Sequence, residues 1–198
     1  YQSWPNNAGS SIRTDNILRV QLSTGLQIEV ITSPGQTAQN SSQNLKYEEH
    51  LGIRFHRTHL ISGSTIGKKK SVLNRIKKII TFPYFLIRIF NLSRKIRPDI
   101  LHAHAMSYCG IAALIIGKLQ KIPVIYEVRS LWFKNSHAML GKAQQFCFEK
   151  LERYVVHHVD GFVGISEGIM NAFKDIRSDG TIIGNAVFEK EIVPIEEI

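Results

Sequence analysis

The chain has 198 residues, which is enough for one domain with a substantial core and too few for two domains of ordinary size. Its residues are 43% hydrophobic and 21% charged, a composition that excludes collagen, coiled coils and wholesale disorder. The net charge of +9 indicates an anionic partner, namely nucleic acid, a phosphorylated ligand or an acidic lipid surface.

The first half of the chain alternates apolar periods with turn signals. We expect helices over residues 10–24 and 71–96, strands over 27–32 and 52–57, and an exposed polar loop over 36–44. Pro83 should break or kink the second helix, because proline lacks the backbone N–H and clashes with the preceding turn.

The second half alternates strands and helices more regularly. Strands are predicted at residues 99–103, 124–128, 161–165 and 181–183, and helices at 108–119, 140–157 and 167–173. This order predicts a Rossmann-like α/β fold, a doubly wound parallel sheet with helices on both faces. Ligands of such sheets bind outside the carboxyl ends of the strands. Four segments should therefore face one crevice: Ser33, 102–106, 127–132 and 166–168.

We place one domain over residues 1–185 and an outgoing linker over 186–198. A loop of small residues that opens a helix normally follows a strand, yet only four residues precede Pro5. We therefore expect an opening, central strand upstream of the sequence in hand. The cysteines Cys109 and Cys147 match no disulfide or zinc framework and suit a reducing cytosol, and no apolar stretch approaches the ~20 residues of a spanning helix.

Two glycine-containing segments resemble known functional motifs, and neither fits its motif completely. Gly164 to Gly168 fits the G-x-S-x-G elbow of a hydrolase, but the last histidine, His158, precedes Ser166, so a triad cannot follow in chain order. Ser166 is instead expected to cap a helix. The run from Gly63 to Lys69 lacks both the spacing and the hydroxyl of a phosphate-binding P-loop.

Polar side chains gather at two predicted strand ends. His102 and His104 alternate along one strand and should point to the same side. A zinc site would need a third ligand that the spacing does not identify, so we predict no metal and a role at a catalytic edge, with a buried, hydrogen-bonded histidine as the alternative. Glu127 and Arg129 share a face of the next strand, as either site residues or a structural ion pair.

Basic residues concentrate in one region. Ten lysines and arginines and no acid lie between Lys68 and Arg97, interleaved with apolar residues. This pattern favours an anionic bilayer surface, with a solvated helix face as the alternative. The residues assigned to this surface are Lys68, Lys69, Lys70, Arg75, Lys77 and Lys78. Nucleic acid is not expected, because no recognition module or stacking platform accompanies the charge.

Five segments, in order along almost the whole chain, together resemble glycosyltransferase family 4. They are NAGSSIRTDN (7–16), RPDILHAH (97–104), IPVIYEVRSLW (122–132), VDGFVGISEG (159–168) and IIGNAV (182–187). The chain looks like the N-terminal, acceptor-side half of a GT-B enzyme of bacterial polysaccharide or lipid-linked sugar assembly. Many relatives carry histidine at the place of Arg129, and proline at the place of Gly184.

The resemblance implies a hexosyltransferase that moves a sugar from a nucleotide-sugar donor to a glycan or lipid-linked acceptor, without a cofactor or metal. It assigns a catalytic role to His104, Glu127 and Arg129, acceptor binding to His102, Ser130, Trp132, Ser166 and Glu167, and the donor-phosphate loop to Gly9 and Ser10. A second, donor-binding domain would follow the linker, so we expect residues 1–198 alone to be inactive. We also expect a cytoplasmic location, peripheral on the inner face of the plasma membrane.

Two alternatives stay open beside the transferase. One is a noncatalytic module that docks on membranes through the basic region. The other is half of a sugar-nucleotide epimerase, since those enzymes share the two-domain architecture.

Overall fold

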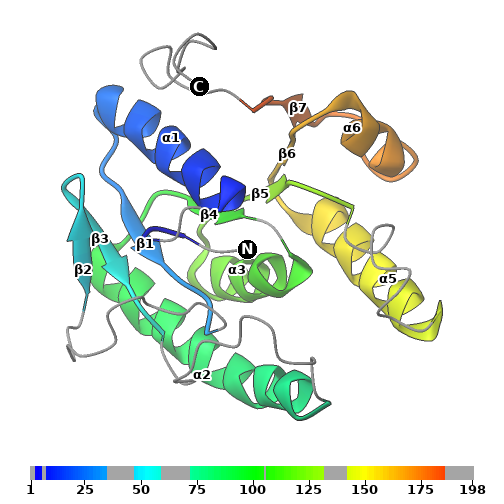
Figure 1. Cartoon of the computed structure of the whole chain (residues 1–198), viewed down its shortest axis with the longest axis horizontal. Coiled ribbons are helices and arrows are strands. Elements are labelled where there is room, and N and C mark those ends of the chain that lie inside the picture. The colour runs from blue at the N-terminus through cyan, green and yellow to red at the C-terminus, as the bar shows by residue number, and fades with distance from the viewer. Residues whose placement is uncertain are drawn as a thin grey trace, which may run out of the picture. The chain divides into compact units, whose positions relative to one another are not determined.

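A computed structural model describes residues 3–5, 8–34, 47–58, 72–104, 106–131 and 142–185. Figure 1 shows the helices and strands of the chain. The chain divides into two compact units, Tyr1–Arg88 with Asn185–Ile198, and Ile89–Gly184. The predicted loop over 36–44, Trp132, Lys68 to Lys70 and the linker over 186–198 lie outside the described residues. The single domain over 1–185 stays a prediction. Within the described part, every helix is too short or too polar to cross a bilayer.

The first unit contains helix α1 (Gly9–Ser23) and a three-stranded sheet. Its strands are β1 (Glu29–Ile31), β2 (Glu48–His50) and β3 (Ile53–His56), in the order β1-β3-β2. β1 and β3 are parallel as predicted, and β2 pairs antiparallel to β3. β2 was not predicted, because its sequence Glu-Glu-His has no apolar alternation. Positive φ angles at Leu51 (54°) and Gly52 (76°) make the tight turn that joins it to β3.

Of the two outcomes predicted at Pro83, a break or a kink, the break does not occur, because helix α2 (Val72–Ile96) continues through the proline, and the kink stays a prediction. Proline removes one backbone N–H from a helix of 25 residues, so most hydrogen bonds of the helix do not depend on this position. A buried stripe at four-residue spacing also favours the unbroken helix. Its members are Thr81, Phe85, Ile89 and Ser93, each at most 8% exposed.

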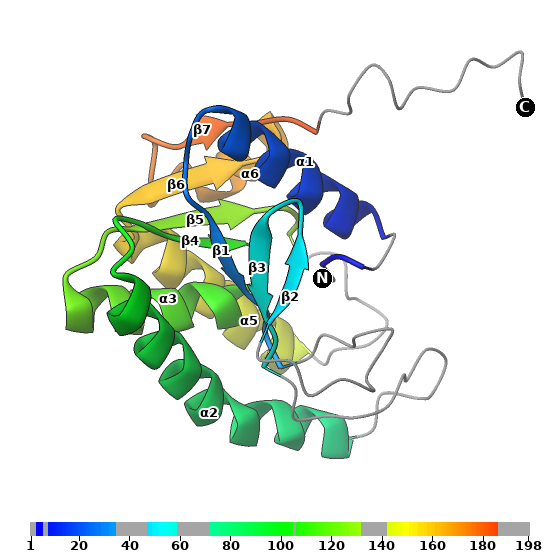
Figure 2. The same cartoon turned by 90° about the vertical axis from the view of Figure 1, so that its left-hand side faces the viewer.

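The second unit follows the predicted alternation closely. Its elements are β4 (Leu101–His104), α3 (Ser107–Gln120), β5 (Val124–Val128), α5 (Lys142–His158), β6 (Gly161–Gly164), α6 (Glu167–Phe173) and β7 (Thr181–Ile182). The four strands are all parallel, in the order β4-β5-β6-β7. Figure 2 shows α3 and α5 together beneath this sheet. The parallel sheet with flanking helices confirms the predicted α/β class.

The core of the second unit lies between this sheet and its helices. Tyr126 on β5, Val155 on α5 and Phe173 on α6 have no exposed side-chain surface and belong to one apolar cluster. Because strand residues alternate between faces, Ala103 and Tyr126 face this core, and His102, His104 and Glu127 face the other side. The core therefore fixes which residues the sheet presents on its opposite face.

A carboxylate is buried in the same core. Glu152 of α5 is 7% exposed and accepts hydrogen bonds from the Tyr126 hydroxyl (2.6 Å) and from the backbone N–H of Ser107 (3.1 Å). It thereby joins α5 to β5 and to the first residue of α3, where a carboxylate also meets the positive end of the helix dipole. Burial raises the pKa of Glu152 above its ordinary value, and the bond from Tyr126 opposes that rise.

Gly110 allows α3 to approach its neighbours closely. A Cβ at this position would lie 2.5 Å from Val155 Cγ1 and 3.1 Å from Tyr126 Cε2. Both neighbours are fully buried, and the branched valine has little freedom to move away. We predict that Gly110→Ala destabilises the chain by about 1–3 kcal/mol in urea unfolding.

Gly168→Ala in α6 is the matched control, because a Cβ there would meet only Ser166 Oγ, at 3.8 Å. This helical alanine should leave stability unchanged or raise it by up to about 1 kcal/mol. Equal stability of the two variants would contradict the close approach of α3.

The raised pKa of Glu152 makes stability depend on pH. The folded chain holds the proton of Glu152 more tightly than the unfolded chain does. The contribution of this protonated side chain to stability is therefore fully present below the ordinary pKa of 4.5, and it is lost as the pH rises through the folded-state pKa. We predict that the stability of Glu152→Gln relative to the parent increases from pH 4 to pH 8, by about 1.4 kcal/mol for each unit of pKa shift. Urea unfolding at several pH values measures it, with Glu149→Gln on the same helix as the control for loss of a carboxylate. A constant difference between parent and Glu152→Gln would refute the burial argument.

Candidate functional site

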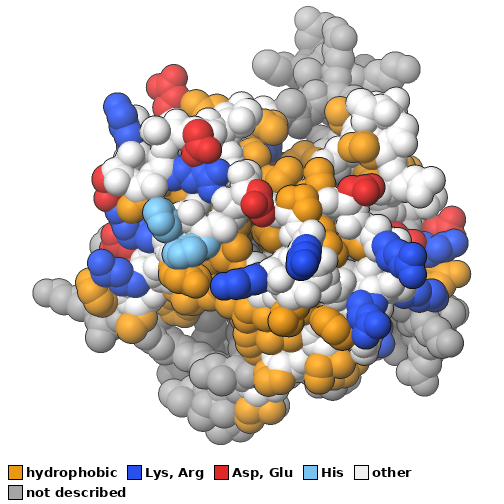
Figure 3. Space-filling view, turned by 180° about the vertical axis from the view of Figure 1, so that it is seen from behind, with side chains coloured by type: hydrophobic (Ala, Val, Ile, Leu, Met, Phe, Trp, Pro, Cys, Tyr) orange, Lys and Arg blue, Asp and Glu red, His pale blue; other side chains and the backbone are white. Residues whose placement is uncertain are grey.

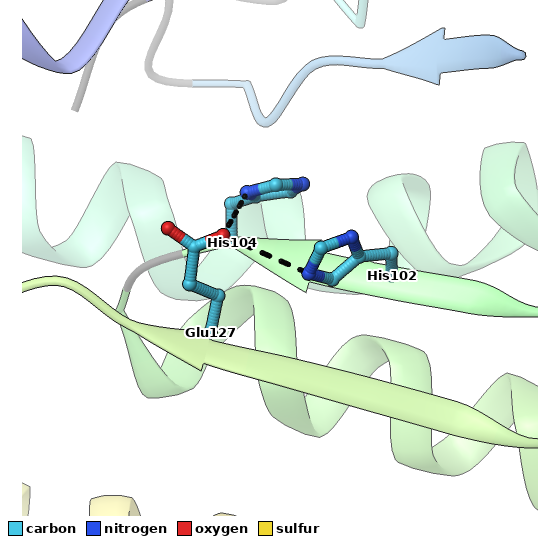
Figure 4. Close-up of side chains that lie close together, drawn as sticks. All are labelled: His102, His104 and Glu127. Carbon is cyan, nitrogen blue, oxygen red and sulfur yellow. Dashed lines mark ion pairs between the residues drawn. The ribbon is translucent and has the colours of Figure 1, made fainter. Parts of the chain in front are cut away.

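Four side chains meet at the carboxyl ends of β4 and β5, on the sheet face opposite the core. His104 is the last residue of β4 and pairs in register with Glu127 of β5. His102 lies two residues earlier and shares their face, and Arg129 follows the end of β5. Figure 4 shows both histidine rings beside the Glu127 carboxylate. The structure thus brings together four residues that the sequence had placed at one crevice.

Glu127 and Arg129 form a buried ion pair. Arg129 Nε donates to Glu127 Oε1 at 2.9 Å, and the two side chains are only 4% and 2% exposed. Removing water from two charges is tolerated because each neutralises the other at hydrogen-bond distance. The two residues thus form the ion pair that was predicted as one alternative, and the catalytic roles assigned to Glu127 and Arg129 stay predictions.

His104 contacts both members of the pair. Its Nδ1 lies 2.6 Å from Arg129 Nη2 and 3.3 Å from Glu127 Oε2. The side chain is 23% exposed, so one side of the ring is held by the pair and part of it is accessible. The ion pair therefore fixes the orientation of the His104 ring, and the accessible part of the ring is able to contact a ligand.

His102 lies against the same cluster. Its ring centroid is 4.0 Å from that of His104, and its Nε2 lies 3.8 Å from Glu127 Oε2, beyond hydrogen-bond distance. Nε2 is buried and has no hydrogen-bond partner among the described residues. Burial lowers the pKa of His102 to about 3, and the positive charge of Arg129 acts in the same direction, against the opposing effect of Glu127. His102 is accordingly neutral near pH 7.

The two histidines and Glu127 have the donor types of a zinc site. One ligand atom from each lies within 4.8 Å of the others, and His₂Glu is a known catalytic zinc set. Glu127 is the third ligand that sequence spacing could not identify, because it comes from the neighbouring strand. However, the donor atom of His104 nearest Glu127 already accepts from Arg129, whose fixed positive charge opposes a cation. The donor set therefore does not fit a metal while Arg129 is in place, and the absence of a metal stays a prediction.

The other predicted site residues lie at several places. Ser166 is the N-cap of α6, and its Oγ accepts from the Ile169 N–H at 3.4 Å, which confirms the predicted capping role. Glu167 is exposed in the first turn of the same helix, where its charge is favourable. Ser130 is half-buried directly after Arg129. Their roles in acceptor binding stay predictions, as does that of Trp132.

Gly9 and Ser10 are the first two residues of α1, in the first unit. Gly9 is exposed, and a Cβ there would meet nothing within 4 Å. The cap residue Ala8 gives no side-chain hydrogen bond to the helix. A role in holding a donor phosphate stays a prediction of the resemblance.

Comparison with known proteins agrees with this architecture. No curated protein sequence matches the chain significantly. Among solved structures, the chain is similar to sucrose-phosphate synthase from Thermosynechococcus elongatus, with a TM-score of 0.72 and 14% identity over 96% of this chain. The match covers 46% of that protein, so the chain spans about half its length.

A family model, described as the glycosyl transferase 4-like domain, matches residues 8–181. This range includes α1 and the β4–β5 cluster and ends at the first residue of the last strand, β7. It confirms the resemblance to glycosyltransferase family 4 over most of the chain, and the structural similarity confirms the fold of a GT-B N-terminal half. The chain belongs to the glycosyl transferase 4-like domain family.

Proposed function

We propose that the chain is the acceptor-side half of a hexosyltransferase that moves a sugar from a nucleotide-sugar donor to a glycan or lipid-linked acceptor. The observation that carries this proposal is the cluster of His102, His104, Glu127 and Arg129 at the carboxyl ends of two parallel strands, where ligands of such sheets bind. Family membership supports the reaction class. The biological setting we propose is bacterial polysaccharide or envelope synthesis.

The exposure of the four residues separates their roles. Glu127 and Arg129 are buried and satisfy each other, whereas His102 and His104 are 24% and 23% exposed. We assign ligand contact to the histidines and positioning to the ion pair. An imidazole ring is able to form hydrogen bonds with sugar hydroxyls through its nitrogens.

The donor side is proposed to come from a further domain of a longer protein. Transfer from a nucleotide sugar requires cationic groups and N–H dipoles at the departing diphosphate, with the acceptor hydroxyl held near the anomeric carbon. The described cluster has one cation, Arg129, and that cation is neutralised by Glu127. We therefore propose that residues 1–198 alone give no turnover.

The same protein is proposed to bind the inner face of the plasma membrane through α2. In the described part of this helix, Ile80 is 69% exposed and Ile87 is 57% exposed. Arg94 and Lys95 are exposed in its last turn. Figure 3 shows apolar side chains exposed among lysines and arginines on one face of the molecule. Exposed apolar side chains next to basic ones suit an anionic bilayer surface.

Activity of the longer gene product tests the transferase proposal. We predict that His104→Ala lowers nucleoside diphosphate release from nucleotide sugars, in the presence of cell-envelope acceptors, by at least about tenfold, equivalent to ~1.4 kcal/mol of transition-state stabilisation. His157→Ala is the control, because this histidine is exposed near the end of α5. Unchanged release by His104→Ala would contradict the proposed site.

Vesicle sedimentation tests the membrane proposal. We predict that Arg94→Glu/Lys95→Glu lowers binding to phosphatidylglycerol vesicles by at least about tenfold, because each basic residue near the surface contributes ~1 kcal/mol. Lys150→Glu/Lys174→Glu has the same change in net charge at exposed positions outside α2, and should bind more tightly than the α2 variant. Equal losses in both variants would mean that net charge alone, and not the α2 surface, attracts the vesicles.

A further inference from the structure

We propose that Arg129 is a positioning residue that holds His104 as a neutral imidazole with its hydrogen on Nε2. His104 then offers an N–H donor to a ligand oxygen and has no free basic nitrogen to accept a proton from a hydroxyl. The hydrogen placement follows from the cluster itself, and the role toward a ligand rests on the proposed function.

The contact between Arg129 and His104 determines which nitrogen carries the hydrogen. A guanidinium has five N–H donors, no acceptor, and does not lose its proton in proteins. Its Nη2 lies 2.6 Å from His104 Nδ1, a distance that requires Nδ1 to accept. A neutral imidazole that accepts at one nitrogen carries its hydrogen on the other, here Nε2.

Glu127 is the competing partner. Its Oε2 lies 3.3 Å from the same Nδ1 and would accept a hydrogen placed there. That hydrogen would then face the Arg129 N–H across 2.6 Å, which places two donors against each other. Glu127 does not need this bond, because its Oε1 accepts from Arg129 Nε at 2.9 Å. The arginine contact is the shorter of the two and decides the tautomer.

The same contact opposes a doubly protonated His104, since that form also carries a hydrogen on Nδ1. Among the described residues, the charged and titratable groups that face the ring are Glu127 of β5, Arg129 directly after that strand and His102 of β4, and the pKa of His102 is lowered to about 3. The rim of the cluster is therefore formed by two neutral rings, 4.0 Å apart, above a neutralised ion pair. Figure 4 shows the Nδ1 edge of His104 turned toward Glu127 and its other nitrogen turned away.

This arrangement determines which kind of ligand atom His104 is able to bind. An Nε2–H donor with no net charge matches an oxygen with a free lone pair, such as a sugar hydroxyl or a phosphoryl oxygen. In this form His104 does not take the proton of an attacking hydroxyl, because a general base needs a nitrogen that is free to accept it. If transfer occurs, the proton of the acceptor hydroxyl must therefore go to another group.

Nitrogen NMR measures the tautomer directly in the 198-residue chain. We would label the histidines with ¹⁵N, record long-range ¹H–¹⁵N spectra near pH 7, and assign His104 by the signals lost in His104→Gln. The expected pattern is a hydrogen-bearing Nε2 and an unprotonated Nδ1. A hydrogen on Nδ1, alone or together with one on Nε2, would overturn the proposal in the parent chain without any further variant.

Arg129→Met tests the cause, because methionine fills similar space without a donor. We expect the hydrogen of His104 to move to Nδ1, where Glu127 Oε2 accepts it. Because this variant leaves Glu127 buried and unpaired, Arg129→Met/Glu127→Met is the second variant, and it should give a mixture of tautomers. If either variant folds and keeps His104 entirely in the Nε2–H form, Arg129 does not determine the tautomer. No substrate is used, so failure here leaves the transfer assay as an independent test of the proposed function.

Discussion

The buried pair of Glu127 and Arg129 is the interaction on which the site depends. Both charges are withdrawn from water at the end of β5, and each is stable there only because the other is present. Replacing one partner of such a pair typically costs about 3–5 kcal/mol, since the remaining charge stays buried and uncompensated. The pair is therefore able to act as a fixed support for the half-buried histidines of β4.

Strand β5 joins this site to the core through the alternation of its side chains. Tyr126 points into the core and donates to Glu152, which also holds the first N–H of α3. Its neighbour Glu127 points to the opposite face and meets Arg129 and the histidines. Consecutive residues thus fix the helices on one face and the site on the other, so a shift of β5 would disturb both.

Much of this arrangement could be predicted from the sequence, and the failures have identifiable causes. The bounds of β5 and α6 follow from apolar runs with clear turn and capping residues. The site was indicated by the polar residues at the ends of two predicted strands. Strand β2 was missed because a polar edge strand has no periodic signal, and α2 continues through Pro83 because a buried stripe outweighs one lost bond. The contact of Arg129 with His104 and the capping of α3 by Glu152 join residues 25 and 45 positions apart, which spacing alone does not predict.

In the proposed site, the histidines contact the ligand and the ion pair holds the histidines in place. The most direct measurement is a crystal structure of the longer gene product with nucleotide sugar and acceptor bound. The account predicts a ligand oxygen within hydrogen-bond distance of His104 Nε2, while Glu127 and Arg129 keep their contact with each other. A ligand bound directly to Arg129 or Glu127, with the pair separated and the histidines away from it, would contradict the account.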